Sequence, residues 1–410
     1  MARPPAQSVP RGDPPGVPAR RAALRLLDAV LRQGLPLEGA LERATSNLVK
    51  PEDRALAYAI AAEVLRRLPD LDALIDRATA QRLPDDTKAR AALRIALVQA
   101  LVMRTPAHAA IATALPLVDG GPRRLVHGVF GTVMRGGWTL PDPPHLPQDV
   151  TERWRAAWGG EVVEAARRLI AAPPAVDLSF PPERPPAAEG ISLLPGHLRL
   201  PPGTRVPDVE GYAQGGWWVQ DIAAALPARM LGPGGGRTVL DLCAAPGGKT
   251  MQLAAAGWRV TALDVSESRL ARLSDNLART GLQAGIIVAD VMTWSQPGPV
   301  DAILLDAPCS ATGIYRRHPD VLHRARPMAI AALAENQRAM LARAALWLKP
   351  GGSLVYAVCS LEREEGEQVI ERFLAATKGF RLAEQRRVLP GEWLDEGGAD
   401  GFFMARLIRD

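Results

Sequence analysis

The second half of the chain alternates short apolar segments with helical ones, and this alternation limits the folds that the chain can adopt. From about Gly211 onward, five segments have the length and composition of β-strands, and helical stretches such as Ser266–Arg279 and Pro327–Leu348 separate most of them. This pattern is typical of a sheet of parallel strands covered by helices. We therefore predict a parallel α/β sheet within residues 211–410, with strands at Thr238–Leu242, Arg259–Leu263, Gly285–Ala289, Asp301–Leu305 and Ser353–Val358.

A carboxylate or a thiol stands at the end of each of these five strands. The residues are Asp241, Asp264, Asp290, Asp306 with Cys309, and Cys359. Any single aspartate among them could serve only as a helix cap. Because ligands of open α/β sheets bind at the carboxyl ends of the strands, five such ends in succession predict a functional site along this edge.

The turn after the first strand, DLCAAPGGKT from Asp241 to Thr250, consists largely of small residues and glycines. Such a turn lets a ligand approach the backbone, and the helix that follows offers its N–H groups. The spacing fits neither the P-loop nor G-x-G-x-x-G, which disfavours a dinucleotide. Asp264 stands where an acid commonly binds ribose hydroxyls, and Asp290 could accept from an adenine amino group. We predict S-adenosylmethionine as the ligand, since it is a nucleoside that needs no phosphate site.

The chain has only three cysteines, Cys243, Cys309 and Cys359, which excludes a secreted disulfide scaffold. Cys243 lies inside the first turn and is interpreted as a small packing residue. For the other two, a metal site would need further Cys or His ligands nearby, and a redox pair would normally read C-x-x-C. A nucleophile with a partner thiol suits pyrimidine C5 methylation, because thiolate addition at C6 makes the otherwise unreactive C5 able to attack a methyl group.

The first half of the chain has a different character. Residues 1–18 are rich in proline, and we predict a disordered tail. Helical periodicity over residues 19–138 predicts an all-α bundle of six or seven helices. Residues 139–210 are again rich in proline, and we expect a linker, a short helical piece at about 150–172 and a small irregular region there. No apolar stretch is long enough to span a membrane, so we expect a cytoplasmic protein.

Charge is distributed unevenly between the two halves. Residues 1–140 hold 20 Lys and Arg against 13 Asp and Glu, a net charge of +7, whereas the remainder holds 29 against 31, a net charge of −2. A basic front module beside a nearly neutral one indicates an acidic polymer as partner, with nucleic acid first in line. Solvated helix faces are the alternative explanation of this charge.

Four strings occur in the order DLCAAPGGKT, LLDAPCSATG, RRHPD and DGFFMARL, and with them the sequence resembles the RsmB (Sun) family of ribosomal RNA cytosine-5 methyltransferases. The resemblance covers residues 20–410 and is most specific from Gly211 onward. It implies a Rossmann-type methyltransferase domain that uses S-adenosylmethionine, preceded by an all-α domain similar to the antitermination factor NusB that contacts RNA. The implied substrate is a cytosine of small-subunit (16S) ribosomal RNA, free or partly assembled. We expect a monomer with neither a metal nor a membrane partner.

The resemblance also implies roles for individual residues. Cys359 would be the nucleophile that attacks C6, Cys309 would assist release of the methylated product, and Asp306 would hydrogen-bond the cytosine edge. Lys249 would reach the target base or orient Asp306. DNA cytosine methyltransferases use the Pro-Cys thiol of the fourth strand as nucleophile, so the Cys359-Ser360 pair favours RNA. The residues implied in cofactor binding are Cys243, Ala244, Ala245, Pro246, Gly247, Gly248, Lys249, Asp264, Asp290 and Asp306.

The sequence departs from the family at Asp177-Leu178-Ser179, where an Arg-x-Asn stretch is usual, and this leaves the RNA contact of the region open. Two rival functions also stay open. A tRNA cytosine-5 methyltransferase would share every catalytic residue named above. A non-catalytic RNA-binding factor built on the NusB-like module would leave the two thiols and the strand-end acids without a purpose.

Two further motifs have alternative interpretations. Arg316, Arg317 and His318 could contact RNA phosphates or shape the target pocket, or could form an ion pair with Asp320. The stretch Asp400–Phe403 resembles a closing strand at the edge of the sheet, and we assign it a structural role only.

Overall fold

The computed structural model describes residues 13–410, so most of the tail predicted over residues 1–18 lies outside the described residues. The chain divides into two compact units, one that ends at Pro147 and one that spans Gln148–Asp410. The first helix already begins at Val17 and has Pro18 in its first turn. The predicted tail is therefore too long by two residues, because proline at the start of a helix leaves no intrahelical hydrogen bond unmade.

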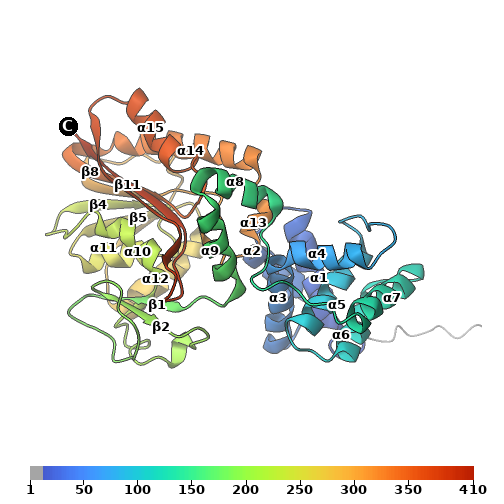
Figure 1. The fold of residues 1–410 in the computed structure, drawn as a ribbon. Helices are drawn as coiled ribbons and strands as arrows, with labels where there is room; N and C mark the ends of the chain where they lie inside the picture. The colour runs from blue at the N-terminus through green and yellow to red at the C-terminus, as the bar shows by residue number, and fades with distance from the viewer. Residues whose placement is uncertain (1–12) are drawn as a thin grey trace, which may run out of the picture. The chain divides into compact units, whose positions relative to one another are not determined.

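The described part of the first unit is helical, as predicted for residues 19–138, and contains seven α-helices and one short 3₁₀ helix (Figure 1). Helix α5 lies at its centre, since every residue from Ala89 to Gln99 except Ala91 is buried. The elements are α1 (Val17–Leu31), α2 (Leu37–Thr45), α3 (Pro51–Arg66), α4 (Leu68–Arg77), α5 (Lys88–Leu101), α6 (Ala107–Ala114), η1 (Leu115–Leu117) and α7 (Gly121–Arg135).

Two buried arginines of α5 are neutralised within the bundle. Arg94 forms a bidentate pair with Asp72 at 2.7 and 2.8 Å, and Arg90 binds Asp72 and Asp76. A buried guanidinium without such partners would be costly, so part of the positive charge of this module is already used inside the fold.

The region 139–210 is more regular than predicted, and its two ends belong to different units. Residues up to Pro147 join the helical unit, where Arg67 donates to the Pro141 carbonyl (2.9 Å) and His145 Nδ1 lies 2.6 Å from Asp70. The rest forms the helices α8 (Gln148–Trp158) and α9 (Gly160–Ala171) and two strands, β1 (Val176–Ser179) and β2 (His197–Leu200). Helices α8 and α9 match the short helical piece expected at about 150–172. In the proline-rich segment that follows, the chain is more regular than expected, because strands of four residues among many prolines leave no recognisable pattern.

A small antiparallel sheet has the order β2-β1-β3, where β3 is Trp218–Val219. Asp177 of β1 is buried and forms a bidentate pair with Arg199 of β2 at 2.7 and 2.8 Å, and it also accepts from the Ile222 N–H at 3.0 Å. Although burial alone would raise the pKa of Asp177, its bonds to Arg199 lower it well below the usual range. At the position where the sequence departs from the family, the aspartate therefore serves the fold of this sheet.

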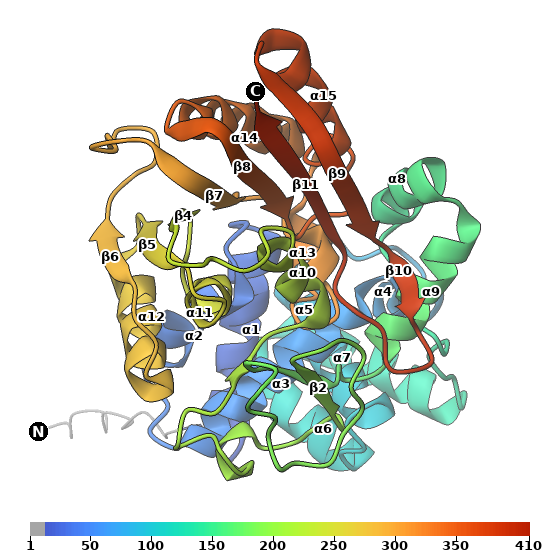
Figure 2. The ribbon, with the colours of Figure 1, turned by 90° about the vertical axis from the view of Figure 1, so that its left-hand side faces the viewer.

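The main sheet has seven strands in the order β6-β5-β4-β7-β8-β11-β9 (Figure 2). The five predicted strands are present and parallel to one another, whereas β11 runs antiparallel between β8 and β9. The Asp400–Phe403 stretch thus leads into an inner strand, not an edge strand, because β9 adds beyond it. The strands are β4 (Thr238–Leu242), β5 (Arg259–Asp264), β6 (Gly285–Val288), β7 (Val300–Asp306), β8 (Leu348–Val358), β9 (Phe380–Val388) and β11 (Phe402–Arg409).

Helices cover both faces of this sheet, with α14 and α15 on one side and α10, α11 and α12 on the other (Figure 2). Residues of β7 alternate between the two cores, so that Ile303 and Leu305 pack with α14 while Ala302 and Leu304 face the opposite side. The helices and remaining short elements are η2 (Val206–Asp208), α10 (Ile222–Arg229), α11 (Gly248–Ala255), α12 (Glu267–Thr280), η3 (Thr312–Ile314), α13 (Val321–Arg324), α14 (Pro327–Ala345), α15 (Glu367–Ala376) and β10 (Pro390–Trp393).

The strand order changes direction between β4 and β7. From β4 the chain proceeds outward through β5 to β6, and then returns to the other side of β4 to form β7 and β8. A crevice for a ligand forms at such a switch point, outside the carboxyl ends of the strands. The crevice expected from this strand order therefore lies at the edge where the acids and thiols stand.

Candidate active site

The turn from Cys243 to Gly248 connects the end of β4 to α11 and has an unusual backbone. Cys243 and Gly247 have positive φ angles of 61° and 106°. A Cβ atom at Gly247 would lie 2.8 Å from Cγ of Leu273, so this position requires glycine both for its φ angle and for the close approach of α12. The turn is anchored by Asp264, whose carboxylate accepts from the N–H groups of Ala245 (3.1 Å) and Ser266 (2.9 Å).

A cavity of about 250 Å³ opens beside this turn. Cys243, Asp264 and Asp290 line it, and Arg269 lies at the same cavity, with Nη1 3.9 Å from Asp264. The remaining lining residues include Pro308 from the loop after β7 and Asn336 and Met340 from α14. The structure therefore brings together the acids that end β5 and β6, as the sequence predicts, and adds residues of α14 that the sequence analysis missed.

Asp241 does not reach this cavity. Its side chain is fully buried, and it accepts a hydrogen bond of 2.6 Å from the Thr250 hydroxyl. Burial raises the pKa of Asp241 to about 7. Asp241 therefore differs from Asp264 and Asp290, because it fastens the end of β4 to the first turn of α11 and does not line the cavity.

Cys243 packs against the core that includes α14, as the sequence suggests, but it is only half-buried and also lines the cavity. Burial raises the pKa of its thiol, and the nearby carboxylates Asp306 and Asp264 raise it further. A neutral thiol at this place offers an apolar surface to a ligand and no charge.

The two remaining thiols meet at the ends of β7 and β8. Cys309 Sγ lies 3.6 Å from Cys359 Sγ, although the residues are 50 positions apart in sequence. Hydrogen bonding to Cys359, together with burial, raises the pKa of Cys309 well above its usual value. Both side chains are half-buried, so a substrate can still reach this pair.

Lys249 connects the turn after β4 to the thiol end of the site. Its Nζ donates to Asp306 Oδ2 at 2.8 Å and lies 5.0 Å from the ring centroid of Phe402. Burial by itself would lower the pKa of Lys249, but the Asp306 carboxylate outweighs it and raises the pKa. Of the two roles expected for Lys249, this geometry matches the orientation of Asp306.

Arg316 and Arg317 are engaged in the interior of the fold. Arg316 is buried and donates to Asp221 at 2.9 Å and to Asp400 at 3.2 Å, and Arg317 also binds Asp400. Asp221 in turn caps α10 through the Ala223 N–H at 2.9 Å. The two arginines therefore join Asp221, at the start of α10, to Asp400, just before β11, and hold the start of that strand in place. The sequence offered only Asp320 as a partner for them.

The residues that hold the loop after Cys359 in place were also not identified from the sequence. Two acids in this loop are buried, Glu362 and Glu365, while Arg363 and Glu364 between them are exposed. Trp154 of α8 donates to Glu362 at 3.1 Å, and Glu365 accepts from the backbone N–H of Ser310 at 2.8 Å. In the sequence these acids belong to a charged run, which is normally solvated.

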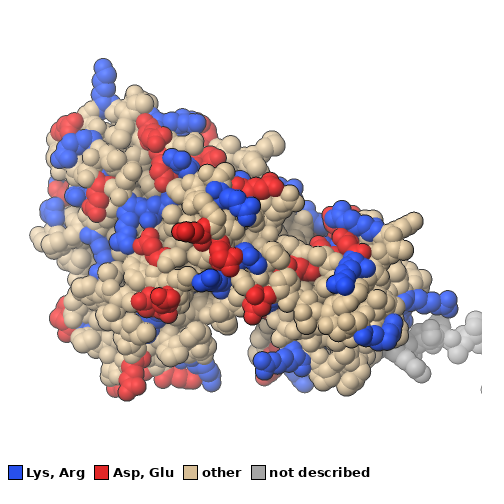
Figure 3. All heavy atoms as spheres, viewed as in Figure 1, with Lys and Arg blue, Asp and Glu red and all other residues tan. Residues whose placement is uncertain are grey.

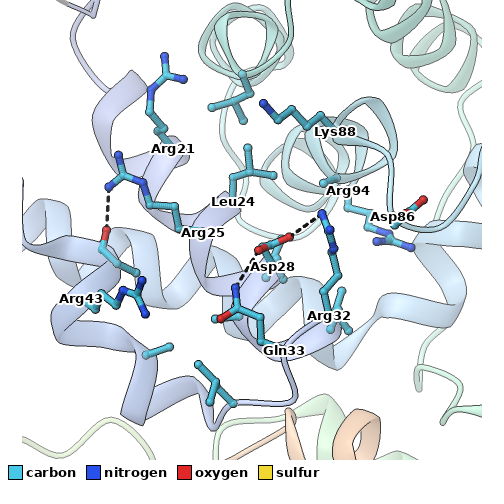
Figure 4. A pocket seen from close by; sticks show the side chains of 18 of the residues that line it. Arg21, Leu24, Arg25, Asp28, Arg32, Gln33, Arg43, Asp86, Lys88 and Arg94 are labelled. Carbon is cyan, nitrogen blue, oxygen red and sulfur yellow. Dashed lines mark hydrogen bonds and ion pairs between the residues drawn. The ribbon is translucent and has the colours of Figure 1, made fainter.

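A second cavity, of about 920 Å³, lies in the helical unit between α1, α2 and the start of α5. Within it, Arg25 donates to the Ala44 carbonyl at 3.1 Å and Arg32 pairs with Asp28 at 3.2 Å. Figure 4 shows that its basic side chains come from different helices; they are Arg21, Arg25, Arg32, Arg43, Lys88 and Arg94. On the face drawn in Figure 3, basic and acidic side chains are interspersed.

Over residues 13–410, no group of three or more His, Cys, Asp or Glu side chains is arranged to hold a metal ion. Within the same residues, no helix has both the length and the apolar character needed to cross a membrane.

Comparison with known proteins agrees with both halves of the fold. Residues 228–408 match the family model described as 16S rRNA methyltransferase RsmB/F, and residues 17–134 match the NusB family. The sequence is 35% identical to ribosomal RNA small subunit methyltransferase B of Xanthomonas campestris over 96% of this chain and 98% of the relative. It is 33% identical to the Vibrio cholerae protein of the same name over 95% of this chain and 97% of the relative.

Solved structures share the fold at lower identity. The crystal structure of PH0851 superposes with a TM-score of 0.72 at 23% identity, covering 98% of this chain and 100% of that one. NSun6 from Pyrococcus horikoshii superposes with a TM-score of 0.55 at 20% identity, covering 64% of this chain and 98% of that one. With relatives aligned over nearly their whole length, the chain belongs to the RsmB family of ribosomal RNA small subunit methyltransferases, S-adenosylmethionine-dependent enzymes that join a NusB-like helical domain to a Rossmann-type methyltransferase domain.

Proposed function

We propose that this protein methylates C5 of a cytosine in small-subunit ribosomal RNA through a covalent bond between Cys359 and C6 of the base. The observation that carries this proposal is the pair of thiols 3.6 Å apart beside the cavity at the strand ends. C5 of cytosine is a poor nucleophile until a thiolate adds to C6. A second cysteine next to the first can then, in its thiolate form, take the proton that C5 must lose.

The cavity at the ends of β5 and β6 fits S-adenosylmethionine, which supplies the methyl group when bound. Asp264 and Asp290 line it and would face the hydroxyl and amino groups of a nucleoside. In the Cys243–Lys249 turn, Gly247 allows the close packing of Leu273 from α12, which holds the backbone of the turn in its shape. No phosphate needs to be accommodated, which suits a turn without the P-loop spacing.

The chemistry at the base falls to four side chains of this chain. Cys359 adds to C6 as a thiolate, while Asp306, held by Lys249 at 2.8 Å, hydrogen-bonds the edge of the base and stabilises charge as the adduct forms. Once Cys359 is bonded to C6 it no longer carries the charge that helps to keep Cys309 protonated, so Cys309 can lose its own proton to solvent. After methylation, the Cys309 thiolate takes the C5 proton, and the bond between C6 and Cys359 breaks with its electron pair returning to the Cys359 sulfur, which releases the product.

The RNA must present an unpaired cytosine, since the target base has to leave its stack to reach both thiols. We assign the phosphate contacts to the helical unit, where the basic side chains around the larger cavity, other than the buried Arg94 that Asp72 neutralises, provide suitable partners for an RNA backbone. Buried Asp177 does not take part, because Arg199 already occupies its carboxylate.

The test is methyl transfer from labelled S-adenosylmethionine to deproteinised small-subunit ribosomal RNA, with tRNA in parallel, followed by mapping of the labelled base. We expect label at C5 of one ribosomal cytosine. Label in tRNA alone would overturn the substrate and retain the chemistry. Label on an exocyclic nitrogen or on a ribose would overturn the thiol mechanism.

A further inference from the structure

Glu365 is a buried carboxylate that the proposed chemistry does not use. It follows Cys359 by six residues and has 0% relative exposure. Its oxygens accept from the backbone N–H of Ser310 at 2.8 Å, the Ser310 hydroxyl, the Ser360 hydroxyl at 2.5 Å and the Gln337 amide at 3.1 Å. A carboxylate offers about four lone-pair positions, so these four donors fill its capacity.

The donors come from three separate segments. Ser310 is the neighbour of Cys309, Ser360 is the neighbour of Cys359, and Gln337 stands on α14. Gln337 also donates to the carbonyl of Pro308 at 2.9 Å, and the Gly313 N–H donates to the carbonyl of Cys359 at 3.0 Å. A single side chain thus joins the two loops that carry the thiols and fastens them to a helix.

Burying a carboxyl group here costs folding free energy, and a residue that only filled space would not incur this cost. Burial raises the pKa of Glu365, against the effect of its hydrogen-bond donors, all four of which are neutral groups. A buried acid in such surroundings is less favourable than an apolar side chain of similar volume. Its position between the two cysteine loops provides a reason for the acid.

We propose that Glu365 is a positioning residue for methyl transfer, which holds the loops of Cys309 and Cys359 so that both sulfur atoms face one target carbon pair. The inference rests on the proposed function for its chemical purpose. The geometric part does not depend on it, because the 3.6 Å separation of the sulfur atoms can be tested without RNA or cofactor.

Phenylarsine oxide is a suitable probe, because its arsenic forms one bond to each of two adjacent thiols, while the two thiol protons leave with its oxygen as water. The measurements are the affinity of the folded full-length protein for this probe and the kcat and KM of methyl transfer. Cys309→Ala and Cys359→Ala serve as references for binding by a single thiol, which lacks the second, intramolecular bond.

Three substitutions at Glu365 separate position from charge. Glu365→Gln retains the length, its oxygen can accept from Ser310 N–H and Gln337, and its NH₂ can donate to the two serine hydroxyls, which can turn to accept. We expect it to bind the arsenical as the parent protein does. Glu365→Asp retains the charge but is too short to meet both loops, and Glu365→Ala removes every bond.

For Glu365→Asp and Glu365→Ala we expect arsenical affinity to fall by at least about tenfold and kcat by about 10²-fold, with the KM for S-adenosylmethionine unchanged. The exposed neighbour provides the matched control, since Glu364→Ala should leave all three quantities at the parent value. If Glu365→Ala does not fold, the aspartate variant decides the outcome.

Arsenical affinity and kcat within twofold of the parent in the aspartate variant would overturn the proposal. If the kcat of Glu365→Gln falls as far as that of Glu365→Asp while arsenical binding stays at the parent value, the proposal is also overturned. The charge of Glu365, and not its position between the loops, would then account for the loss of activity. Tight arsenical binding by a parent protein that methylates no RNA would refute the proposed function and leave the positioning by Glu365 in place.

Discussion

The two ends of the active site are built in different ways. At the cofactor end, the supporting bonds join residues close in sequence, such as Thr250 to Asp241 (9 positions) and the Ala245 N–H to Asp264 (19 positions). At the thiol end, they join Ser310 to Glu365 (55 positions) and Trp154 to Glu362 (208 positions). The cofactor end is therefore a local property of strand, turn and helix, whereas the thiol end exists only when distant segments have packed together.

If this comparison is right, changes at the thiol end should destroy turnover without altering cofactor affinity. Cys359→Ala is the strongest case, and we expect kcat to fall by at least about 10⁴-fold because the nucleophile itself is lost. Titration calorimetry with S-adenosylmethionine should give the parent affinity. Appreciable turnover in this variant would show that the nucleophile has been assigned wrongly.

Cys309→Ala should act at a later step. Without the thiol that accepts the C5 proton, we expect turnover to fall by about 10²–10⁴-fold and a covalent protein–RNA adduct to accumulate. The adduct would appear as a denaturant-resistant band of reduced mobility in gel electrophoresis. If Cys359→Ala trapped the adduct instead, the roles of the two cysteines would have to be exchanged.

The same difference explains which features could be predicted from the sequence. The strands β4 to β7 agree with prediction to within a residue or two, because each is a short apolar run with a distinct end. By contrast, β8 begins at Leu348 and not at Ser353, since Lys349–Gly352 has the composition of a turn but continues the strand. Local patterns describe elements well, and they fail where tertiary pairing overrides propensity.

For the site, the acids and thiols at the strand ends could be identified because each directly follows a strand. The burial of Glu365 could not, since in a run that reads Glu-Arg-Glu-Glu a solvated surface is the ordinary expectation. The partners of Arg316 were also out of reach, because Asp221 and Asp400 are 95 and 84 positions away. Polar networks that close over such distances leave no periodic trace in a sequence.

Lys249 bridges the two ends and sharpens the comparison. Lys249→Met removes the cation 2.8 Å from Asp306, so the acid loses its fixed orientation and we expect kcat to fall by about 10²–10³-fold. Stopped-flow trapping of the RNA adduct would place the loss at adduct formation. A variant in which only the KM for S-adenosylmethionine rises would assign Lys249 to the cofactor end alone.

Asp264→Ala should have the converse effect of the cysteine substitutions. The change removes a carboxylate that lines the cavity and that accepts from Ala245 and Ser266, so we expect cofactor affinity to weaken by about 10- to 100-fold. Phenylarsine oxide binding at the thiol pair should stay at the parent value. Substitution of the exposed residue Glu267 is the control and should leave the cofactor affinity unchanged. An unchanged cofactor affinity in Asp264→Ala would place the cofactor elsewhere.

The smallest expected effect is on the free energy of unfolding, and it tests whether Asp241 is protonated in the folded protein. Burial raises the pKa of Asp241 to about 7, far above its value in an unfolded chain. The folded state therefore binds this proton more tightly, and its contribution to stability is complete at low pH and is lost as pH rises through about 7. Between about pH 6 and about pH 8 this loss amounts to about 1.4 kcal/mol. Asp241→Asn cannot titrate, so urea unfolding should show a pH dependence shallower than that of the parent protein by this amount. Equal slopes would mean that Asp241 is charged in the folded protein, and the cofactor end would then depend on a buried ion.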